Sequence, residues 1–177
     1  CHLCPNTAEI ELAQPFNNHK TRVLPIVRDN QGKIWLGTET EGLLRYDPKS
    51  DSYEHIPLPL SSKNIVSLLL DGTDLIISCF SQSSPILKLD INTLKSSEFY
   101  RPFNRKIDFI QKTSSGDYFL AGLSSPQMFG NPEKGFQKIL DHPVSKIIEC
   151  AKDDYWAVRT SSPIRRYRNG AWKEYLV

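Results

Sequence analysis

The sequence predicts an all-β protein built from four similar units, each with four antiparallel strands. Its clearest segment is 23–46, where two apolar runs flank the turn Asp29-Asn30-Gln31-Gly32. Asp and Asn hydrogen-bond their own backbone in turns, and Gly accepts positive φ, so this segment is typical of a tight hairpin. The same order of apolar run, turn and apolar run returns three times further along the chain.

Two markers establish the repeat. The centre of the second expected strand recurs at intervals of roughly 40 residues, which is the period of propeller blades, in Trp35, Ile76, Phe119 and Trp156. The third expected strand is entered through Ser-Ser-Pro in three of the units, at 83–85, 124–126 and 161–163. Proline can open a strand because its missing N–H then lies at the strand end. The two markers together indicate a true internal repeat.

The chain divides into a leading segment and four units. The leading segment, residues 1–21, carries one outer-strand-like stretch at 8–14, where apolar and polar residues alternate. The units that follow span residues 22–62, 63–104, 105–145 and 146–177.

Each unit offers four short apolar runs separated by turn residues. In unit one the expected strands are 23–27, 34–36, 42–46 and 53–58. In unit two they are 65–70, 75–78, 85–90 and 98–100. In unit three they are 107–110, 118–121, 127–129 and 136–139. In unit four they are 147–150, 155–158, 164–167 and 172–175, and Asn169-Gly170 between the last two is a strong hairpin signal.

Four-stranded units of this length, without helical periodicity, predict a β-propeller or part of a larger one. A single blade cannot bury both of its faces, so blades stack side by side and cover one another. We therefore expect Trp35, Phe119 and Trp156 to lie in the core between blades. Cys79 falls inside an apolar run and is expected to be a small buried residue.

The overall charge argues against a nucleic-acid partner. The net charge is +2, and the basic residues are scattered rather than clustered. No apolar run has the length of a transmembrane helix. The chain begins with Cys1 rather than Met, so any signal peptide or membrane anchor is expected outside these residues.

The cysteines predict neither a metal site nor a cofactor. Cys1, Cys4, Cys79 and Cys150 are too few for a disulfide scaffold at this length. Cys1-His2-Leu3-Cys4 resembles part of a metal or redox motif, but no second Cys/His pair stands at ligand spacing. A local disulfide between Cys1 and Cys4, or idle thiols, is the favoured interpretation.

The segment 26–38, Ile-Val-Arg-Asp-Asn-Gln-Gly-Lys-Ile-Trp-Leu-Gly-Thr, closed by Gly-Leu-Leu-Arg-Tyr-Asp at 42–47, resembles the two-component regulator propeller repeat. Units two to four keep the architecture without the Trp-Gly-Thr signature. The resemblance implies the periplasmic sensor region of a hybrid two-component system. In that family the propeller is followed by a β-sandwich domain, a membrane span and a histidine kinase, and several members respond to oligosaccharides. It transfers no ligand-binding residue to this chain.

Three functions remain open from the sequence: a non-catalytic sensing or scaffold propeller, a protein-interaction propeller, and a propeller lyase or hydrolase. The carboxylates that could form catalytic pairs, Asp29 with Asp71 and Asp153 with Asp154, all fall in hairpin turns, where Asp has a local backbone role. The four histidines share no motif with a serine or a cysteine. A non-catalytic role is therefore favoured, and no catalytic, cofactor-binding or metal residue is assigned.

If an oligosaccharide binds, aromatic side chains on strand ends and turns would stack on it. The candidates are Tyr46, Tyr100, Tyr167 and Trp172. Ordinary packing within the blades is the simpler role for each, so the ligand-binding residues stay unassigned.

The number of units predicts an open assembly. Propellers of the resembling family commonly close with about seven or eight blades, so four units are about half a ring. An unclosed stack exposes an apolar face on units one and four, and such faces usually mark an interface. We expect a homodimer through these faces; a closed four-bladed monomer and a piece that aggregates are the alternatives.

Overall fold

The computed structural model describes residues 21–102, 106–122, 125–159 and 163–175. Within these ranges the chain forms sixteen strands in four antiparallel sheets of four strands each, and no helix. The predicted all-β fold of four four-stranded units is thereby confirmed. The expected strand at 8–14 and the Cys1-His2-Leu3-Cys4 motif lie outside the described residues.

The sheets are named blades 1 to 4 in chain order. Blade 1 contains β1 (Val23–Arg28), β2 (Ile34–Thr38), β3 (Leu43–Asp47) and β4 (Ser52–Ile56). Blade 2 contains β5 (Ile65–Asp71), β6 (Asp74–Cys79), β7 (Ile86–Asp90) and β8 (Ser96–Tyr100). Blade 3 contains β9 (Phe109–Lys112), β10 (Tyr118–Gly122), β11 (Ser125–Asn131) and β12 (Gly135–Leu140). Blade 4 contains β13 (Lys146–Ala151), β14 (Asp154–Val158), β15 (Ile164–Arg168) and β16 (Ala171–Tyr175).

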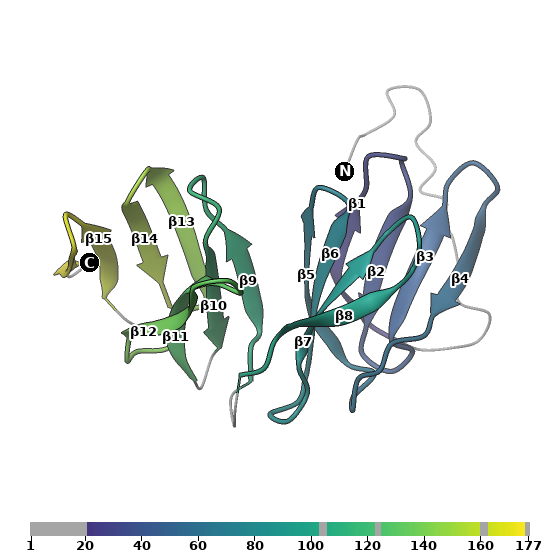
Figure 1. Ribbon diagram of the computed structural model, residues 1–177, viewed down its shortest axis with the longest axis horizontal. Helices are drawn as coiled ribbons and strands as arrows, with labels where there is room; N and C mark the ends of the chain where they lie inside the picture. Colours follow the sequence, from purple (N-terminus) through teal and green to yellow (C-terminus); the bar gives the residue numbers. More distant parts are fainter. Residues whose placement is uncertain (1–20, 103–105, 123–124, 160–162, 176–177) are drawn as a thin grey trace, which may run out of the picture.

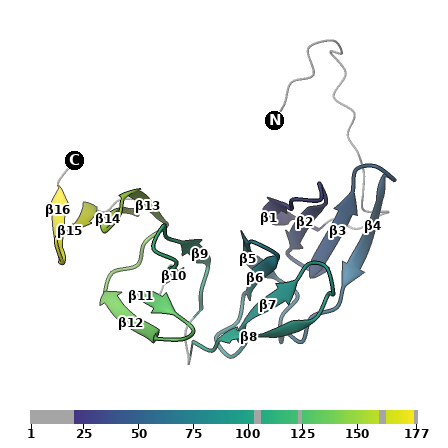
Figure 2. The same cartoon turned by 45° about the horizontal axis from the view of Figure 1, so that its top comes forward.

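The blades stand side by side in an open arc (Figures 1 and 2). The first strand of each blade lies on the concave side, where β5 contacts both β1 and β9, and the last strand lies on the convex side (Figure 2). Blades 1 and 4 occupy opposite ends of the arc. The interpretation as a closed four-bladed ring is therefore wrong, and the open stack is the observed form.

The turn in blade 1 is held by the residues that marked it in the sequence. The Asp29 carboxylate accepts hydrogen bonds from the backbone N–H groups of Gln31 and Lys33, both at 2.9 Å, and Gly32 has a φ of +85°. The other oxygen of the Asp29 carboxylate accepts a 2.8 Å hydrogen bond from Nε1 of Trp35. The turn and the buried indole are therefore fixed by one carboxylate.

Three apolar clusters fill the seams between successive blades. The seam of blades 1 and 2 is formed around Trp35, Leu43, Ile65 and Leu75, and it includes Cys79, whose predicted burial is confirmed. The seam of blades 2 and 3 is formed around Ile76, Ile110, Tyr118 and Leu120. The seam of blades 3 and 4 is formed around Phe119, Ala121, Ile147 and Tyr155.

The strand register confirms that the four marker residues are equivalent. Trp35, Ile76, Phe119 and Trp156 pair across to the third strand of their own blades, with Arg45, Lys88, Phe129 and Arg166 respectively. Each marker in the first three blades is at most 1% exposed, because the following blade covers it.

Trp156 departs from its predicted burial. It has the register position that the following blade covers in blades 1 to 3, and it stays partly exposed because no further blade of the described chain follows blade 4. The expectation that Trp156 belongs to the core between blades is therefore wrong for this chain. Its neighbour Tyr155, which points the other way, packs against Phe119 with ring centroids 4.8 Å apart and fills that core instead.

Candidate functional site

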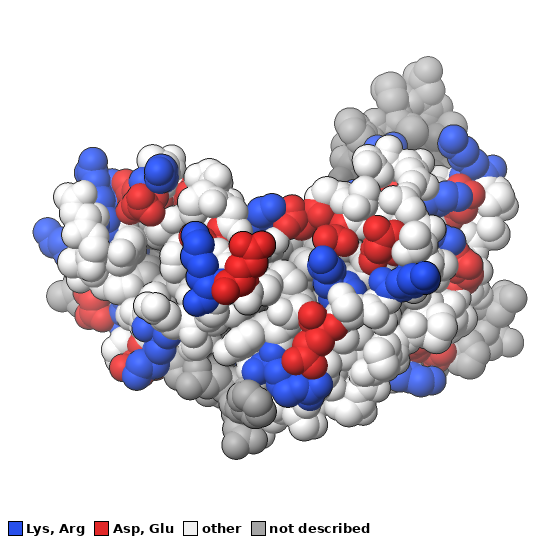
Figure 3. Space-filling model, viewed as in Figure 1, with Lys and Arg blue, Asp and Glu red and all other residues white. Residues whose placement is uncertain are grey.

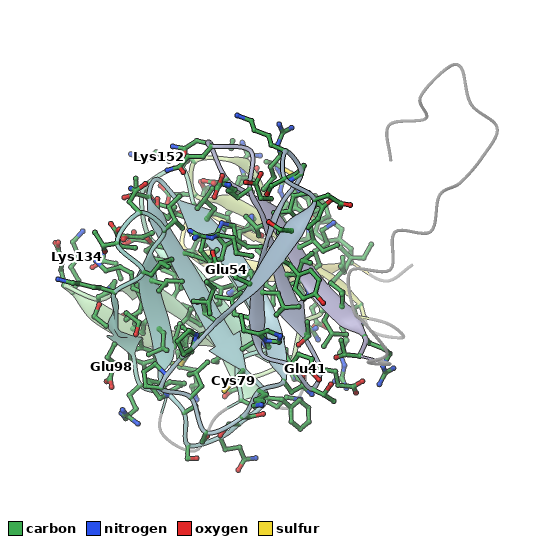
Figure 4. All side chains as sticks on the ribbon, turned by 90° about the vertical axis from the view of Figure 1, so that its right-hand side faces the viewer. Glu41, Glu54, Cys79, Glu98, Lys134 and Lys152 are labelled. Carbon is green, nitrogen blue, oxygen red and sulfur yellow. The ribbon has the colours of Figure 1, made fainter. Side chains whose placement is uncertain are left out.

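The arc has two edges that carry loops. The upper edge holds the turns between first and second strands, such as the one containing Lys152; the lower edge holds the β2–β3 loop containing Glu41 (Figure 4). On the face shown in Figure 3, basic and acidic side chains are interspersed, and no continuous basic surface appears on that face. This agrees with the absence of a clustered positive charge in the sequence.

A groove of about 470 Å³ opens between blades 2 and 3 on the upper edge. We call it the acidic groove because carboxylates dominate its charged lining. Blade 2 contributes Asp71, Asp74, Lys88, Glu98 and Phe99. Blade 3 contributes Tyr118, Asn131 and Glu133.

At the base of the acidic groove, Asp71 joins the two blades. Its carboxylate accepts a 2.5 Å hydrogen bond from Lys112 Nζ and another from the Tyr118 hydroxyl. Burial acts to raise the pKa of the Asp71 carboxyl, but the bonds from Lys112 and Tyr118 outweigh it and the pKa is lowered. Burial, followed by the bond to Asp71, raises the pKa of Tyr118 above its usual range. Asp71 is therefore an ionised inter-blade anchor, a role that its position in a turn did not reveal.

This anchor predicts an acid-sensitive effect of Tyr118→Phe. We expect the variant to lower the free energy of unfolding by ~1–2 kcal/mol at neutral pH, because the ionised Asp71 loses a donor. The folded-state pKa of Asp71 is depressed, so its stabilisation is present above the unfolded pKa of about 3.9 and is lost as pH falls through the folded value. The difference between wild type and variant should therefore shrink in acid, as measured by urea denaturation across pH.

Tyr46→Phe is the matched control for Tyr118→Phe. Tyr46 donates to Asp51 at 2.7 Å, but this contact lies on the exposed β3–β4 turn. Its loss should cost less, about 0.5 kcal/mol. Equal losses for both variants at every pH would contradict the anchor.

The outer part of the acidic groove keeps carboxylate oxygens accessible. The Asp74 carboxylate lies 3.4 Å from Nζ of Lys88, and the Glu98 carboxylate lies 2.6 Å from Nη2 of Arg101. All four side chains are about one third to one half exposed. The Phe99 ring stands edge-on to Tyr118 with centroids 5.0 Å apart. Figure 4 shows Glu98 at the outer surface of the molecule. The groove thus combines hydrogen-bond acceptors with aromatic surface.

A second groove, of about 570 Å³, lies on the lower edge between blades 1 and 2. Glu41, His55 and Lys63 provide its charged and titratable groups, and the connection 57–60 provides much of its apolar wall. It has no carboxylate cluster comparable to that of the acidic groove.

The structure places the four aromatic candidates in packing contacts. Tyr46 donates to Asp51, and Tyr100 packs on Phe136 with ring centroids 4.4 Å apart. Tyr167 and Trp172 lie 5.4 Å apart by centroid and belong to the seam of blades 3 and 4. None of the four lines the acidic groove or the second groove.

The two proposed carboxylate pairs have separate partners. The Asp29 carboxylate accepts a hydrogen bond from the Trp35 indole, whereas the Asp71 carboxylate accepts hydrogen bonds from Lys112 and Tyr118. Asp154 forms a two-bond ion pair with Arg166, at 2.8 and 2.6 Å, and Asp153 occupies the preceding turn with a φ of +59°. These contacts give the carboxylates of Asp29, Asp71 and Asp154 structural roles and bring neither pair together as a catalytic site.

No metal site is formed by the described part of the chain, where no three His, Cys, Asp or Glu side chains gather closely enough to hold an ion. Cys79 is buried and Cys150 exposed, and both are free thiols. Within the same described ranges, no helix has the length and apolar character needed to cross a membrane.

Comparisons by sequence find nothing: no protein-family model matches the chain, and neither does any curated protein. Comparison by structure finds the extracellular domain of a hybrid two-component system from B. thetaiotaomicron, with a TM-score of 0.74 and 15% identity over 93% of this chain. A one-component system domain from the same organism has a TM-score of 0.65 and 21% identity over 77% of this chain. Inactive virginiamycin B lyase from Staphylococcus aureus, crystallised with quinupristin, has a TM-score of 0.73 and 13% identity over 92% of this chain.

The chain spans only part of each of these proteins: 25% and 20% of the two extracellular domains, and 58% of the lyase. The first two agree with the resemblance to the two-component regulator propeller repeat. At sequence identities of 13% to 21%, these structural likenesses show a shared fold and nothing beyond the fold. The chain therefore has the β-propeller fold found both in the extracellular domain of a hybrid two-component system and in virginiamycin B lyase.

Proposed function

We propose that the chain is part of a non-catalytic sensing propeller in the periplasmic region of a hybrid two-component system, and that it binds an oligosaccharide in the acidic groove. The observation that carries this proposal is the combination of accessible carboxylates and aromatic surface in that groove. The structural likeness to extracellular sensor domains supports the sensing role.

The lining of the acidic groove suits sugar hydroxyls. Ionised carboxylates are acceptors only, and each oxygen can accept more than one hydrogen bond. Asp74 and Glu98 present such oxygens at the rim, and Glu133 lines the facing wall. Phe99 adds an apolar surface for the C–H face of a pyranose ring.

Binding at a seam also gives a means of signalling, because a ligand that touches both blades favours one spacing of the blades over another.

The same residues argue for binding rather than catalysis. Asp71 is held ionised by Lys112 and Tyr118, so it is not a general acid near neutral pH. His55 and His142, the histidines within the described residues, are both exposed and lie on blade 1 and in the β12–β13 connection. In the full protein, the partners of this propeller would be the downstream domains of the same chain.

Calorimetric titration with a panel of neutral and amino-sugar oligosaccharides tests the proposal. We expect Asp74→Asn combined with Glu98→Gln to weaken binding of any ligand found by about tenfold, corresponding to ~1.4 kcal/mol. Glu54→Gln is the matched control, because Glu54 is an exposed carboxylate paired with Arg45 on blade 1. Binding that is unchanged in the double variant, or a panel without any binder at millimolar concentration, would overturn the assignment.

A lyase is the second candidate, since the TM-score to virginiamycin B lyase, 0.73, nearly equals that to the sensor domain, 0.74. Incubation with quinupristin followed by liquid chromatography and tandem mass spectrometry distinguishes the two. A sensor leaves the compound unchanged, whereas a lyase that opens a ring by elimination gives an isomer of the same mass with a different retention time and fragmentation pattern. A protein-interaction propeller is the third function that the sequence leaves open.

A further inference from the structure

A small pocket of about 50 Å³ lies inside the seam of blades 3 and 4. We call it the aromatic pocket because five rings form most of its wall. Phe119 and Phe129 come from blade 3, and Tyr155, Tyr167 and Trp172 come from blade 4. None of these residues lines the acidic groove or the second groove. The aromatic pocket is therefore a separate feature of the molecule.

The three rings of blade 4 form one row across the sheet. Tyr155 pairs with Tyr167, and Tyr167 pairs with Trp172. The corresponding row of blade 2 contains no aromatic residue and consists of Leu75, Leu89 and Ser96. The repeat itself therefore does not require aromatic side chains at these positions.

Two hydrogen-bond donors of this row have no acceptor. The Tyr155 hydroxyl and the Trp172 indole N–H are both buried, and neither forms a hydrogen bond with the described residues. The Tyr155 side chain is only 2% exposed. Ser115 and the backbone of Asp153 also act on this hydroxyl, but neither forms a hydrogen bond with it. Buried donors without a partner are unfavourable and rare in native proteins, so an acceptor that enters the aromatic pocket gains from both.

The strand register explains why Tyr155 lacks a partner. Tyr118 directly precedes the marker residue of blade 3, as Tyr155 does in blade 4, and its hydroxyl donates to Asp71 of the preceding blade. In blade 3 the place of Asp71 is taken by Thr113. The Thr113 hydroxyl is engaged in its own turn, where it donates to the Asp117 carbonyl at 3.0 Å. The blade that precedes Tyr155 therefore offers no carboxylate at the place of Asp71.

The charges around the aromatic pocket select the kind of acceptor. Burial, followed by the charges of Glu149 and Asp153, raises the pKa of Tyr155, so its hydroxyl keeps the proton and can donate. The same negative charges disfavour a carboxylate or a phosphate. An ammonium group has donors only and leaves both buried donors unpaired. A neutral hydroxyl accepts two hydrogen bonds and donates one, which matches Tyr155, Trp172 and the Asp153 carboxylate that also lines the pocket.

The size of the aromatic pocket limits what enters it. Its volume of about 50 Å³ corresponds to roughly four water-sized groups. A wider polar groove of about 520 Å³ adjoins it on the upper edge of blade 4, and Asp153 and Tyr167 line both. Lys152, which is labelled at this edge in Figure 4, also lines the wider groove, together with Arg168 and Asn169. A larger ligand can therefore place one small group in the pocket and the remainder in the groove.

We propose that the aromatic pocket binds a neutral primary alcohol group. Its oxygen accepts hydrogen bonds from the Tyr155 hydroxyl and from Nε1–H of Trp172, its proton is donated to Asp153, and its carbon lies against the rings. The group belongs either to a short free alcohol or to the hydroxymethyl arm of a hexopyranoside whose ring occupies the adjoining groove. The site does not depend on the proposed function, because it shares no lining residue with the acidic groove.

Titration with 1-propanol, followed by proton–nitrogen correlation NMR, tests this proposal. The chain has three indole N–H signals, from Trp35, Trp156 and Trp172, and Trp172→Phe identifies the last of them. We expect only the Trp172 signal to move, with saturation at millimolar concentration, because so small a ligand makes few contacts. The Trp35 signal should stay in place, since its N–H already donates to Asp29. Propionate and propylammonium should leave the Trp172 signal unchanged.

Methyl glucopyranoside and methyl xylopyranoside distinguish the two sources of the alcohol group, because they differ only in the hydroxymethyl arm. If the ring occupies the adjoining groove, the glucoside moves the Trp172 signal at a lower concentration than 1-propanol does, and the xyloside has no effect. A signal that responds to 1-propanol and to neither glycoside indicates a short free alcohol.

Tyr155→Phe removes one of the two buried donors. We expect it to weaken the binding of 1-propanol by about five- to tenfold. Its melting temperature should equal or exceed that of the wild type, because an unpaired buried hydroxyl is lost. Tyr118→Phe, at the equivalent position, loses its bond to Asp71 and should melt at a lower temperature. Tyr46→Phe, on the exposed β3–β4 turn, is the control and should bind 1-propanol like the wild type.

Three results overturn the proposal. The first is a Trp172 signal that does not move, or that moves equally with propionate or propylammonium. The second is a linear shift of all three indole signals, which indicates a general solvent effect. The third is a Tyr155→Phe variant that binds 1-propanol like the wild type, or that is destabilised as much as Tyr118→Phe, since its hydroxyl is then paired within the protein. None of these results bears on Asp74 or Glu98, so the acidic groove is tested separately.

Discussion

Replacement of Trp35 by Ala is expected to lower the free energy of unfolding by ~3–5 kcal/mol. Trp35 is 0% exposed and stands at the centre of the seam between blades 1 and 2, among Leu43, Ile65 and Leu75. Truncation leaves a cavity that two packed sheets cannot collapse into, and it removes the 2.8 Å hydrogen bond to the buried Asp29 carboxylate. Urea denaturation followed by intrinsic fluorescence and circular dichroism measures the loss.

Trp156→Ala is the matched control for this substitution, because Trp156 has the same register position on the uncovered face of blade 4. We expect a loss of only about 1 kcal/mol, since part of the ring is already in water. Trp35→Phe separates the hydrogen bond from the packing. If Trp35→Ala and Trp156→Ala cost the same, coverage by the next blade would not be the source of stability.

Gly130→Ala is expected to lower the free energy of unfolding by roughly 3 kcal/mol or more, from backbone strain and steric overlap together. Gly130 lies near the end of β11 with a φ of +146°. A Cβ there would stand 2.1 Å from the carbonyl oxygen of Gly135, across the β11–β12 hairpin. Because the obstacle is backbone, the hairpin has to open. Denaturation midpoints, together with amide hydrogen exchange in β12, report this opening.

Gly135→Ala is the control within the same hairpin. Gly135 also has a positive φ, +84°, but nothing lies within 4 Å of its added Cβ. Gly135→Ala should therefore lower the free energy of unfolding only by the backbone strain of a non-glycine residue at positive φ, ~1–2 kcal/mol. A loss for Gly130→Ala no larger than that for Gly135→Ala would show that the hairpin adjusts without cost.

Local patterns predicted the strands and their turns. Asp29 and Gly32 lie in the first turn as expected, and Asn169 and Gly170 both have positive φ, as a two-residue hairpin requires. These features depend on residues close together in the chain, so a single sequence contains the information. The roughly 40-residue repeat then aligned Trp35 with Trp156, and the register confirms that alignment.

The acidic groove could not be predicted in the same way. Asp71 and Tyr118 are 47 positions apart, and only the stacking of blade 3 on blade 2 brings the hydroxyl to the carboxylate. From the sequence, Asp71 is one more turn aspartate and Tyr118 one more apolar strand residue. Asp74 and Glu98 face Glu133 for the same reason, because a seam has no sequence motif of its own.

By itself, therefore, the sequence determined the four antiparallel sheets, their hairpin turns and the equivalence of the blades, because strand periodicity and turn chemistry act over a few residues. The tertiary structure alone decided which equivalent residues are buried. Trp35 is buried and Trp156 partly exposed, and Ile147 is buried and Ile26 exposed, although the members of each pair have the same place in the repeat, because burial depends on whether another blade stands beside them. The open arc and the acidic groove both follow from that stacking.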